Sequence, residues 1–366
     1  MDGSETKISQ QKQQSLIEIP EGYERVLDLS AGDDNSPLQG FVSIHNTFLG
    51  PALGGTRIWK YQDKATALSD ALKLSRAMTY KCAIAGLPFG GGKGVIIYNN
   101  NKSLQNQLLE LYAQQVSLLE GSFYTGEDVG VTEENVQYML QFSPFFIGKT
   151  GQAGDPSNYA ALSAFYSIKA ALEEKFGDSK IEGRKFAVKG VGKTGSELVK
   201  LLFQEGANII ISDTDKNAID SILRQFPKLQ VVLADEIEKQ EVDVFCPCAL
   251  GNDVTQNNIS DFEAKIIVGT ANNQLESDQI GDDLFKRGIL HVPDYVANAG
   301  GLIDVADELL PGGYDKDRVM SNIHKLQYTL KTILKESREK NVNPNRIANQ
   351  ISENRFTPVQ NHVQTS

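Results

Sequence analysis

The sequence predicts a two-domain α/β protein with a doubly wound parallel sheet in its second domain. Its 366 residues are more than one ordinary domain holds, and 40% of them are hydrophobic, which is enough for a sizeable core. Residues 149–158, rich in glycine, proline and small polar side chains, are the expected domain boundary or hinge. Beyond them a strand, a glycine-rich loop, a helix and a second strand follow one another, an order typical of doubly wound sheets.

Composition excludes several classes of protein. The formal net charge is -11 and the pI is about 5.0, which argues against a nucleic-acid partner and against a polybasic membrane patch. No apolar run approaches the roughly 20 residues of a membrane span. The polar N-terminus lacks an apolar signal region, so a cytoplasmic location is expected. The three cysteines, Cys82, Cys246 and Cys248, are expected to be buried thiols, and no metal site is predicted.

Two lysines stand in an apolar, glycine-rich stretch, residues 80–97. Gly90–Gly92 immediately precede Lys93, and three consecutive glycines predict an unusual turn or a close approach to a ligand. Residues 95–98 read as a buried strand, which places Lys93 at a loop-to-strand junction. Burial there would lower the lysine pKa, and the second lysine, Lys81, would lower it further, so that Lys93 could act as a general base. The alternative is a solvated lysine beside an ordinary turn.

The spacing of apolar residues predicts the other strands and helices of the first domain. A strand is expected at residues 38–48, a turn-rich connector at 50–57, and helices at 64–80 and 103–120. Asp128 then lies between glycines, just before a helix that Thr132 could cap. It could point inward, although a solvated turn is the alternative.

The second domain opens with the order of a dinucleotide-binding fold. The strand 185–189 precedes GVGKTG, residues 190–195, and a helix and the strand 208–212 follow, ending at Asp213. Gly190 permits the tight turn, Gly192 lets the backbone approach the pyrophosphate, and Gly195 lets the helix pack on the strand. Asp213 would bond the adenosine ribose and repel a 2′-phosphate, which favours NAD over NADP.

Two later strands, 242–245 and 266–269, are each followed by small polar residues. Ligands bind beyond the carboxyl ends of strands in such sheets, which places Asn272 and Asn273 at the cofactor. Helices are expected to continue to about residue 353. The cofactor-binding residues predicted from the whole pattern are Gly190, Val191, Gly192, Lys193, Thr194, Gly195, Asp213, Ala249, Asn272 and Asn273.

Several motifs occur together and in order between residues 40 and 353. They are GPALGGTR (50–57), MTYKCAIAGLPFGGGKGVII (78–97), GEDVG (126–130), GVGKTG (190–195), PCALG (247–251), ANNQL (271–275) and PDYVANAGGLIDVADEL (293–309). This pattern resembles the NAD-dependent amino acid dehydrogenases of the leucine, phenylalanine and valine type. The resemblance implies a homo-oligomer, a dimer or an octamer, that reversibly deaminates a hydrophobic L-amino acid to a 2-oxo acid and ammonia.

The resemblance also implies an arrangement of domains. Residues 1–15 would be a disordered arm, 16–149 a substrate and dimerisation domain, and 150–319 a Rossmann NAD-binding domain. Helices 320–353 would return to the first domain, and residues 354–366 would be a polar tail.

Roles for single residues follow from the same resemblance. Lys93 would activate the water that attacks the imino carbon, and Asp128 would carry protons to and from the substrate nitrogen. Lys81 would pair with the substrate carboxylate, with Asn298 helping to hold it. The side-chain pocket would comprise Leu53, Gly54, Gly126, Leu302 and Val305. Glycine at 126 and leucine at 302 favour an aromatic substrate over leucine or valine.

Two positions depart from the family pattern. Ala160 stands where a threonine near the nicotinamide amide is usual, and Gly94 follows the catalytic lysine where a larger residue is usual. Ala160 motivates one alternative to an amino acid dehydrogenase, a diverged relative that makes another product from a 2-oxo acid. A second alternative, from a different class, is a non-catalytic NAD-binding regulatory protein.

Overall fold

The computed structural model describes residues 15–16, 19–30, 33, 35–98, 105–148, 155–249 and 251–357. The chain forms two compact α/β units, as the sequence predicted. Unit 1 comprises Met1–Cys82 and Pro88–Thr150, and unit 2 comprises Ala83–Leu87 and Gly151–Ser366. The arm before residue 15, residues 149–154 of the predicted hinge and the tail after residue 357 lie outside the described residues.

Unit 1 is built on a mixed six-stranded sheet with the order β1-β2-β3-β5-β4-β6. Its strands are β1 (Ser15–Leu16), β2 (Arg25–Asp28), β3 (Gly40–Asn46), β4 (Ala52–Trp59), β5 (Gly90–Ile97) and β6 (Phe123–Gly126). Pairing is antiparallel from β1 through β3 to β5, and parallel from β5 through β4 to β6. The carboxyl ends of β4, β5 and β6 therefore lie at the same edge of the sheet.

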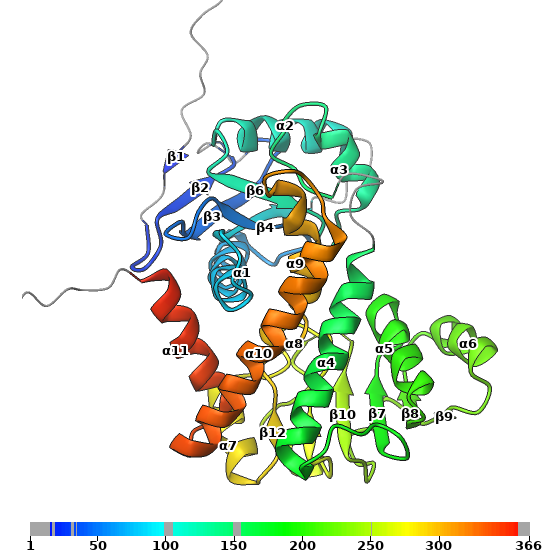
Figure 1. Cartoon of the computed structure of the whole chain (residues 1–366). Coiled ribbons are helices and arrows are strands. Elements are labelled where there is room, and N and C mark those ends of the chain that lie inside the picture. Colours follow the sequence, from blue (N-terminus) through cyan, green and yellow to red (C-terminus); the bar gives the residue numbers. More distant parts are fainter. Residues whose placement is uncertain are drawn as a thin grey trace, which may run out of the picture. The chain divides into compact units, whose positions relative to one another are not determined.

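Helices cover both faces of this sheet (Figure 1). Helix α1 (Lys64–Ile84) packs Ala67 and Ala71 on Phe41 and Val95. On the other face, α2 (Gln105–Ser117) and α3 (Glu133–Met139) bury their apolar sides in a larger cluster with the strands. Thr132 caps α3 in a capping box with Asn135, which confirms the predicted N-cap.

The predicted turn at residues 50–57 is wrong, because this segment is most of the inner strand β4. Its glycines mark close packing instead of a bend. A Cβ on Gly54 would lie 1.9 Å from the carbonyl oxygen of Gly92, and a Cβ on Gly55 would lie 2.6 Å from that of Glu127. The sequence shows the glycines, but the neighbours that require them are 38 and 72 positions away.

The predicted loop at Gly90–Gly92 is also wrong, because these glycines open the buried strand β5. A Cβ on Gly90 would meet the carbonyl oxygen of Asn46 at 1.8 Å, and one on Gly91 would meet the amide of Thr79 at 2.1 Å. Lys93 therefore projects from within a strand and not from a loop-to-strand junction.

Unit 2 contains the predicted doubly wound sheet. All neighbouring strands pair in parallel, in the order β12-β11-β10-β7-β8-β9. The strands are β7 (Lys185–Lys189), β8 (Asn208–Ser212), β9 (Gln230–Val231), β10 (Val244–Pro247), β11 (Ile266–Ile267) and β12 (Leu290–His291). Strands β10, β7, β8 and β9 stand side by side in Figure 1. Because the chain moves outward from β7 and then returns to β10, the topological switch point lies between these two strands.

The helices of unit 2 follow the expected pattern. They are α4 (Pro156–Phe176), α5 (Lys193–Gln204), α6 (Lys216–Gln225), α7 (Asp278–Lys286), α8 (Asp294–Ala297), α9 (Gly300–Ala306), α10 (Lys316–Lys340) and α11 (Pro344–Phe356), with the short 3-10 helices η2 (Ile259–Asp261) and η3 (Asp307–Leu309). Asp155 caps α4, directly after the predicted hinge. The amphipathic helix α7 packs Ile280 and Leu284 on the strands.

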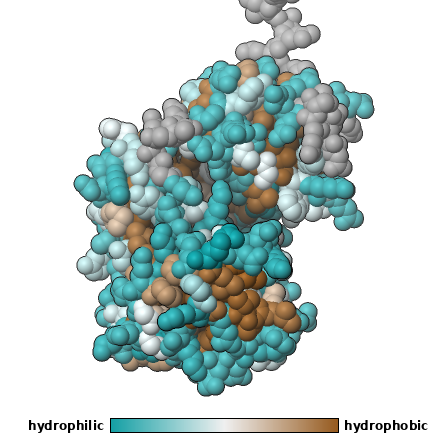
Figure 2. Space-filling model, turned by 90° about the vertical axis from the view of Figure 1, so that its right-hand side faces the viewer, coloured by the Kyte–Doolittle hydropathy of each residue, from teal (hydrophilic) through white to brown (hydrophobic). Residues whose placement is uncertain are grey.

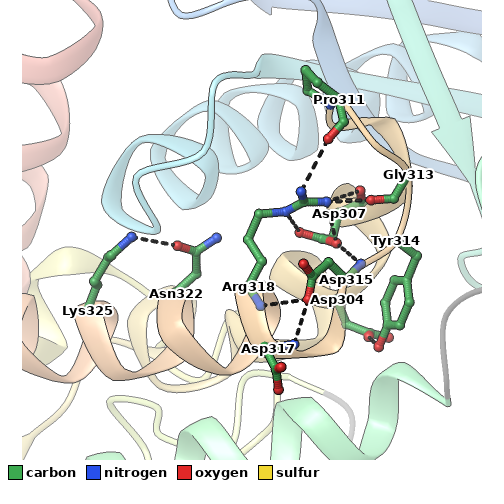
Figure 3. Close-up of polar contacts among 10 residues, drawn as sticks. All are labelled: Asp304, Asp307, Pro311, Gly313, Tyr314, Asp315, Asp317, Arg318, Asn322 and Lys325. Carbon is green, nitrogen blue, oxygen red and sulfur yellow. Dashed lines mark hydrogen bonds and ion pairs between the residues drawn. The ribbon is translucent and has the colours of Figure 1, made fainter.

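Arg318 stabilises the turn between η3 and α10 through several hydrogen bonds (Figure 3). Its guanidinium donates to both carboxylate oxygens of the fully buried Asp307, at 2.6 and 2.8 Å, and to the carbonyl oxygen of Gly313. Farther on, Arg355 of α11 donates to the carbonyl oxygens of Ala83 and Ile84 within unit 2. The packing of the last helices on the first domain stays a prediction.

Apolar side chains are exposed at the β9 edge of unit 2, at Phe203, Val231 and Leu233. Figure 2 views the molecule from the side on which α5, α6 and β9 lie in Figure 1, and a hydrophobic area occupies the lower part of that view. Among the described residues, no helix combines the length and apolar character needed to cross a membrane.

Candidate active site

A lysine–aspartate ion pair lies within unit 1, and its lysine is buried while its aspartate is half-buried. Lys93 comes from β5 and is only 5% exposed, and its Nζ lies 3.0 Å from Oδ2 of Asp128. Asp128 follows β6 in a tight turn that closes with a bond from the amide of Val131 to its carbonyl oxygen. The prediction that Asp128 points inward is therefore confirmed. The ion pair joins a lysine and a carboxylate from segments 35 residues apart.

Burial lowers the pKa of Lys93, although the adjacent carboxylate of Asp128 opposes this effect. The cation that adds to the lowering is Arg57, and Lys81 is not among the main causes. The expectation that Lys81 also lowers the pKa of Lys93 stays a prediction. Burial acts to raise the pKa of Asp128, but Lys93 and Arg57 outweigh it and hold that pKa below its usual value.

Three further side chains extend the pair, and sequence analysis missed all three. Arg57 on β4 donates from Nε to Oδ2 of Asp128 at 2.9 Å and from Nη1 to Oδ2 of Asp70 at 3.1 Å. Tyr61 donates its hydroxyl to the same Asp70 oxygen at 2.5 Å. A strand prediction for residues 50–57 would have identified Arg57 as a candidate. In a strand, Arg57 lies on the same face as Gly55, because alternate residues share a face.

Glycines make room for this network. A Cβ on Gly55 would lie 2.9 Å from Cβ of Asp128 and 3.3 Å from Nζ of Lys93. A Cβ on Gly94 would lie 2.0 Å from the hydroxyl of Tyr112, which in turn bonds Oγ1 of Thr56 at 2.7 Å. The unusual glycine after the lysine is therefore explained by a tyrosine that fills the space of its side chain.

The other residues predicted to contact substrate are distributed over both units. In unit 1, Lys81 lies half-buried in the last turn of α1, and Leu53 is fully buried on β4. A Cβ on Gly126 would lie 2.9 Å from the carbonyl oxygen of Ile147, so local packing also requires this glycine. In unit 2, Leu302 and Val305 are half-buried on α9. Their grouping into one pocket stays a prediction.

The glycine loop of unit 2 has the geometry of a dinucleotide cradle. Gly190 has a φ of +93°, and a Cβ there would lie 2.7 Å from the amide of Ala249. A Cβ on Gly195 would lie 2.0 Å from the carbonyl oxygen of Gly190, so α5 packs directly on the loop. Gly192 differs, because nothing lies within 4 Å of its Cβ position and no side chain caps α5 there. The open space and the uncapped helix N-terminus fit a pyrophosphate.

The neighbouring loops complete the edge of the sheet. Asp213, which follows β8, accepts the amide of Val191 at 2.7 Å and so ties itself to the glycine loop. Ala249 follows β10, and Asn272 and Asn273 follow β11; all three are exposed. Lys193 is also exposed, and Thr194 accepts a bond from Thr270. The predicted cofactor residues therefore come from the carboxyl ends of adjacent strands, and they fit NAD.

A buried charge cluster supports the strand that carries this loop. Lys189, the last residue of β7, lies 2.6 Å from Oε1 of Glu238 and 3.0 Å from Oδ1 of Asp253. Both carboxylates are buried, and Oδ2 of Asp253 has no hydrogen-bond partner among the described residues. One cation thus offsets two buried acids beneath Gly190.

Asn298 ends α8 and is 4% exposed. Its Nδ2 donates to the carbonyl oxygens of Thr270 and Ala271 and to Oδ1 of Asn272. Its own Oδ1 is buried without a hydrogen-bond partner among the described residues. The atom left over is an acceptor, which suits an N–H group better than a carboxylate.

Ala160 lies where helices α4 and α9 approach closely. A Cβ on Gly301 would be 3.5 Å from Cβ of Ala160, and one on Gly300 would be 2.0 Å from the carbonyl oxygen of Tyr159. Ser163 of α4 accepts the amide of Gly300 at the start of α9 and donates to the carbonyl oxygen of Ala297 at the end of α8. Position 160 therefore faces α9 at short range.

Comparison with known proteins gives consistent matches along the chain. The family model described as "Glu/Leu/Phe/Val dehydrogenase, dimerisation domain" matches residues 24–143, and "Glutamate/Leucine/Phenylalanine/Valine dehydrogenase" matches residues 211–361. Leucine dehydrogenase of Bacillus subtilis is 37% identical over 93% of this chain and 94% of its own length. L-tryptophan dehydrogenase of Nostoc punctiforme is 40% identical over 92% of this chain and 94% of its own length.

The crystal structure of L-tryptophan dehydrogenase from Nostoc punctiforme superposes with a TM-score of 0.79 at 39% identity, covering 92% of this chain and 96% of that one. The match extends over both the unit with the lysine–aspartate pair and the unit with the dinucleotide cradle. The chain belongs to the glutamate/leucine/phenylalanine/valine dehydrogenase family, and it is an amino acid dehydrogenase with NAD as its cofactor.

Proposed function

We propose that this protein catalyses the reversible oxidative deamination of a hydrophobic L-amino acid to its 2-oxo acid and ammonia. The observation that carries the proposal is the ion pair between buried Lys93 and half-buried Asp128, in a chain that also holds an NAD cradle. NAD supplies the acceptor for the hydride that leaves the substrate α-carbon. The remaining steps are proton transfers and the addition of water, which the side chains of the protein must catalyse.

Lys93 is the proposed base. Its lowered pKa enlarges the neutral fraction, so that Nζ can take a proton from the water that attacks the imino carbon. Asp128 is ionised at rest, because its pKa is lowered, and it would take up a proton transiently and release it again as it moves protons to and from the substrate nitrogen while ammonia leaves. Two adjacent groups with different proton affinities thereby divide the acid and base work.

Lys81 and Asn298 are proposed to bind the substrate. Lys81 would pair with the carboxylate as a point charge. Asn298 would use its remaining acceptor, Oδ1, for an N–H group of the substrate. Leu53, Gly54, Gly126, Leu302 and Val305 are the proposed pocket for the side chain.

An aromatic side chain is the proposed preference, over leucine and valine. Glycine at 126 with leucine at 302 motivates it, and the 40% identity to an L-tryptophan dehydrogenase supports it. One methylene changes discrimination by only about 1–3 kcal/mol, so the difference between aromatic and aliphatic substrates is expected to be graded.

The enzyme is further proposed to be a cytoplasmic homo-oligomer, a dimer or an octamer. Residues 24–143 match a family model described as a dimerisation domain. The three cysteines are free, buried thiols, as expected in a reducing compartment.

A substrate panel tests the proposal. Purified protein with NAD at alkaline pH is expected to form NADH and an equimolar 2-oxo acid from phenylalanine or tryptophan, and less efficiently from leucine, isoleucine or valine. The ranking of kcat/KM measures the preference. Absence of turnover with all five would refute the proposed reaction, and a different product by mass spectrometry would support the diverged relative.

Replacing Gly192 with alanine is expected to weaken NAD binding at least about tenfold, which equals about 1.4 kcal/mol, because a methyl group would enter the space proposed for the pyrophosphate. The fold should tolerate this change, since nothing in the protein lies within 4 Å of the new atom. Titration of protein fluorescence with NAD measures the affinity, and circular dichroism checks the fold. Gly195→Ala is the contrasting variant, because its Cβ would clash with the carbonyl oxygen of Gly190 and should destabilise the fold itself. Unchanged NAD affinity in Gly192→Ala would contradict the assigned role.

A further inference from the structure

We propose that Arg57, held by Asp70 and Tyr61, is a positioning residue that fixes the Asp128 carboxylate against Lys93. The proposal rests on the proposed roles of Lys93 and Asp128 and deepens them. Its basis is a continuous chain of polar contacts that runs from Lys93 through Asp128 and Arg57 to Asp70 and Tyr61.

The two cations share one oxygen of Asp128. Nζ of Lys93 lies 3.0 Å from Oδ2, and Nε of Arg57 donates to the same atom at 2.9 Å. These contacts come from different strands, β5 and β4, so they fix the carboxylate from two directions. The shared use of Oδ2 leaves Oδ1 as the atom able to exchange a proton with the substrate nitrogen.

Arg57 is itself held in place. Its planar guanidinium bonds Asp128 through Nε and Asp70 through Nη1, and the two contacts together define the orientation of the plane. Asp70 lies on α1, and the hydroxyl of Tyr61 donates to the same oxygen that Arg57 contacts. Side-chain exposure is 22% for Arg57 and 27% for Asp70, so water competes only partly.

The charges of the cluster balance. Lys93 and Arg57 are two cations, and Asp128 and Asp70 are two anions, so the partly buried group carries no net charge while Lys93 is protonated. The charged groups with the largest effects on Lys93 are Asp128 after β6, Arg57 on β4 and Asp70 on α1. Arg57 lowers the pKa of Lys93, whereas Asp70 raises it. The outer pair therefore affects both the position and the proton affinity of the inner pair.

The first arm of the test replaces Arg57 with glutamine. Loss of a cation raises the pKa of Lys93, so the rising limb of kcat/KM against pH, which requires neutral Lys93, should move to higher pH. Loss of the two guanidinium contacts, to Asp128 and Asp70, should also lower kcat by about 10²-fold, which is the cost of misplacing a catalytic group by roughly 1 Å. Arg57→Lys keeps the positive charge but loses the planar guanidinium that contacts both carboxylates at once. It should therefore leave the limb near its original position and still lower kcat.

The second arm replaces Asp70 with asparagine, which keeps an acceptor for Arg57 but removes the negative charge. Because Asp70 raises the pKa of Lys93, this change should move the same limb to lower pH. A merely structural role would not shift the limb in opposite directions in the two variants. Tyr61→Phe should lower kcat mildly without moving the limb.

The outcomes separate this proposal from the one it rests on. If Lys93→Gln is inactive but Arg57→Gln keeps its kcat and pH profile, the positioning role is wrong and the proposed base remains. If Arg57→Gln raises KM with kcat unchanged, Arg57 binds substrate and the positioning role is again wrong. If Lys93→Gln keeps its rate, the proposed function fails first. Circular dichroism and NAD titration identify any variant that fails to fold, and in that case Arg57→Lys and Asp70→Asn decide the question.

Discussion

Replacing Lys93 with glutamine is expected to lower kcat by about 10²- to 10⁴-fold, the usual range for loss of a general base. Glutamine retains most of the length and a hydrogen-bond donor for Asp128, but it cannot take a proton from water. Arg57 still contacts Asp128, so the carboxylate keeps a cation and the fold should persist. Steady-state turnover at saturating substrate measures the effect.

Two comparisons make this result specific. NAD affinity should stay close to that of the unaltered protein, because the cradle belongs to unit 2. Lys335→Gln, an exposed lysine on α10, should keep full turnover. An undiminished kcat in Lys93→Gln would show that Lys93 is not the base, whatever the effect of the substitution on stability.

Replacing Lys189 with methionine is expected to cost about 3–5 kcal/mol of unfolding free energy, the usual result of removing one partner of a buried ion pair. Lys189 bridges Glu238 and Asp253, whose carboxylates are 7% and 4% exposed. Without the ammonium group, two buried acids would face each other beneath the cofactor loop. Chemical denaturation at neutral pH measures the loss, read from the transition of unit 2.

The deficit of this variant should shrink as the pH falls. Burial raises the pKa of Asp253, although Lys189 opposes it, and removal of the lysine raises that pKa further. An acid with a raised folded-state pKa contributes stability that is present at low pH and is lost as the pH rises through that pKa. Lys185→Met, at the exposed start of the same strand, is the matched control and should change stability by less than about 0.5 kcal/mol. Equal losses of unfolding free energy in Lys189→Met and Lys185→Met would show that the ion pairs of Lys189 add no stability of their own.

Local sequence patterns predicted unit 2 well because its signals are local. The strand 185–189, the glycine loop and Asp213 lie within 29 residues, so one short window contains the whole pattern, although Gly190 also packs against Ala249 farther along the chain. In unit 1 the glycines do not mark turns, although their sequence context predicts turns. Gly54 and Gly90–Gly92 are strand residues whose small size is required by segments far away in sequence, and no short window of sequence contains those partners.

The lysine–aspartate pair and the residues that hold it differed in the same way. Lys93 stood out because a lysine among glycines and apolar residues is unusual in itself. Arg57 did not, because its partner Asp128 is 71 positions away and its other partner, Asp70, lies on an ordinary helix. A polar network of this kind can be predicted only when the register of the strands that carry its residues is known.

The dense packing around the glycines of β4 and β5 has a consequence for how this enzyme can evolve. At Gly54, Gly90 and Gly91 even one methyl group would lie within about 2 Å of a main-chain atom. These positions therefore offer no viable single substitution, so the immediate surroundings of the lysine are closed to gradual change. A change of substrate preference is therefore expected at other positions of the proposed pocket, such as Leu302 and Val305 on α9, while these glycines stay fixed.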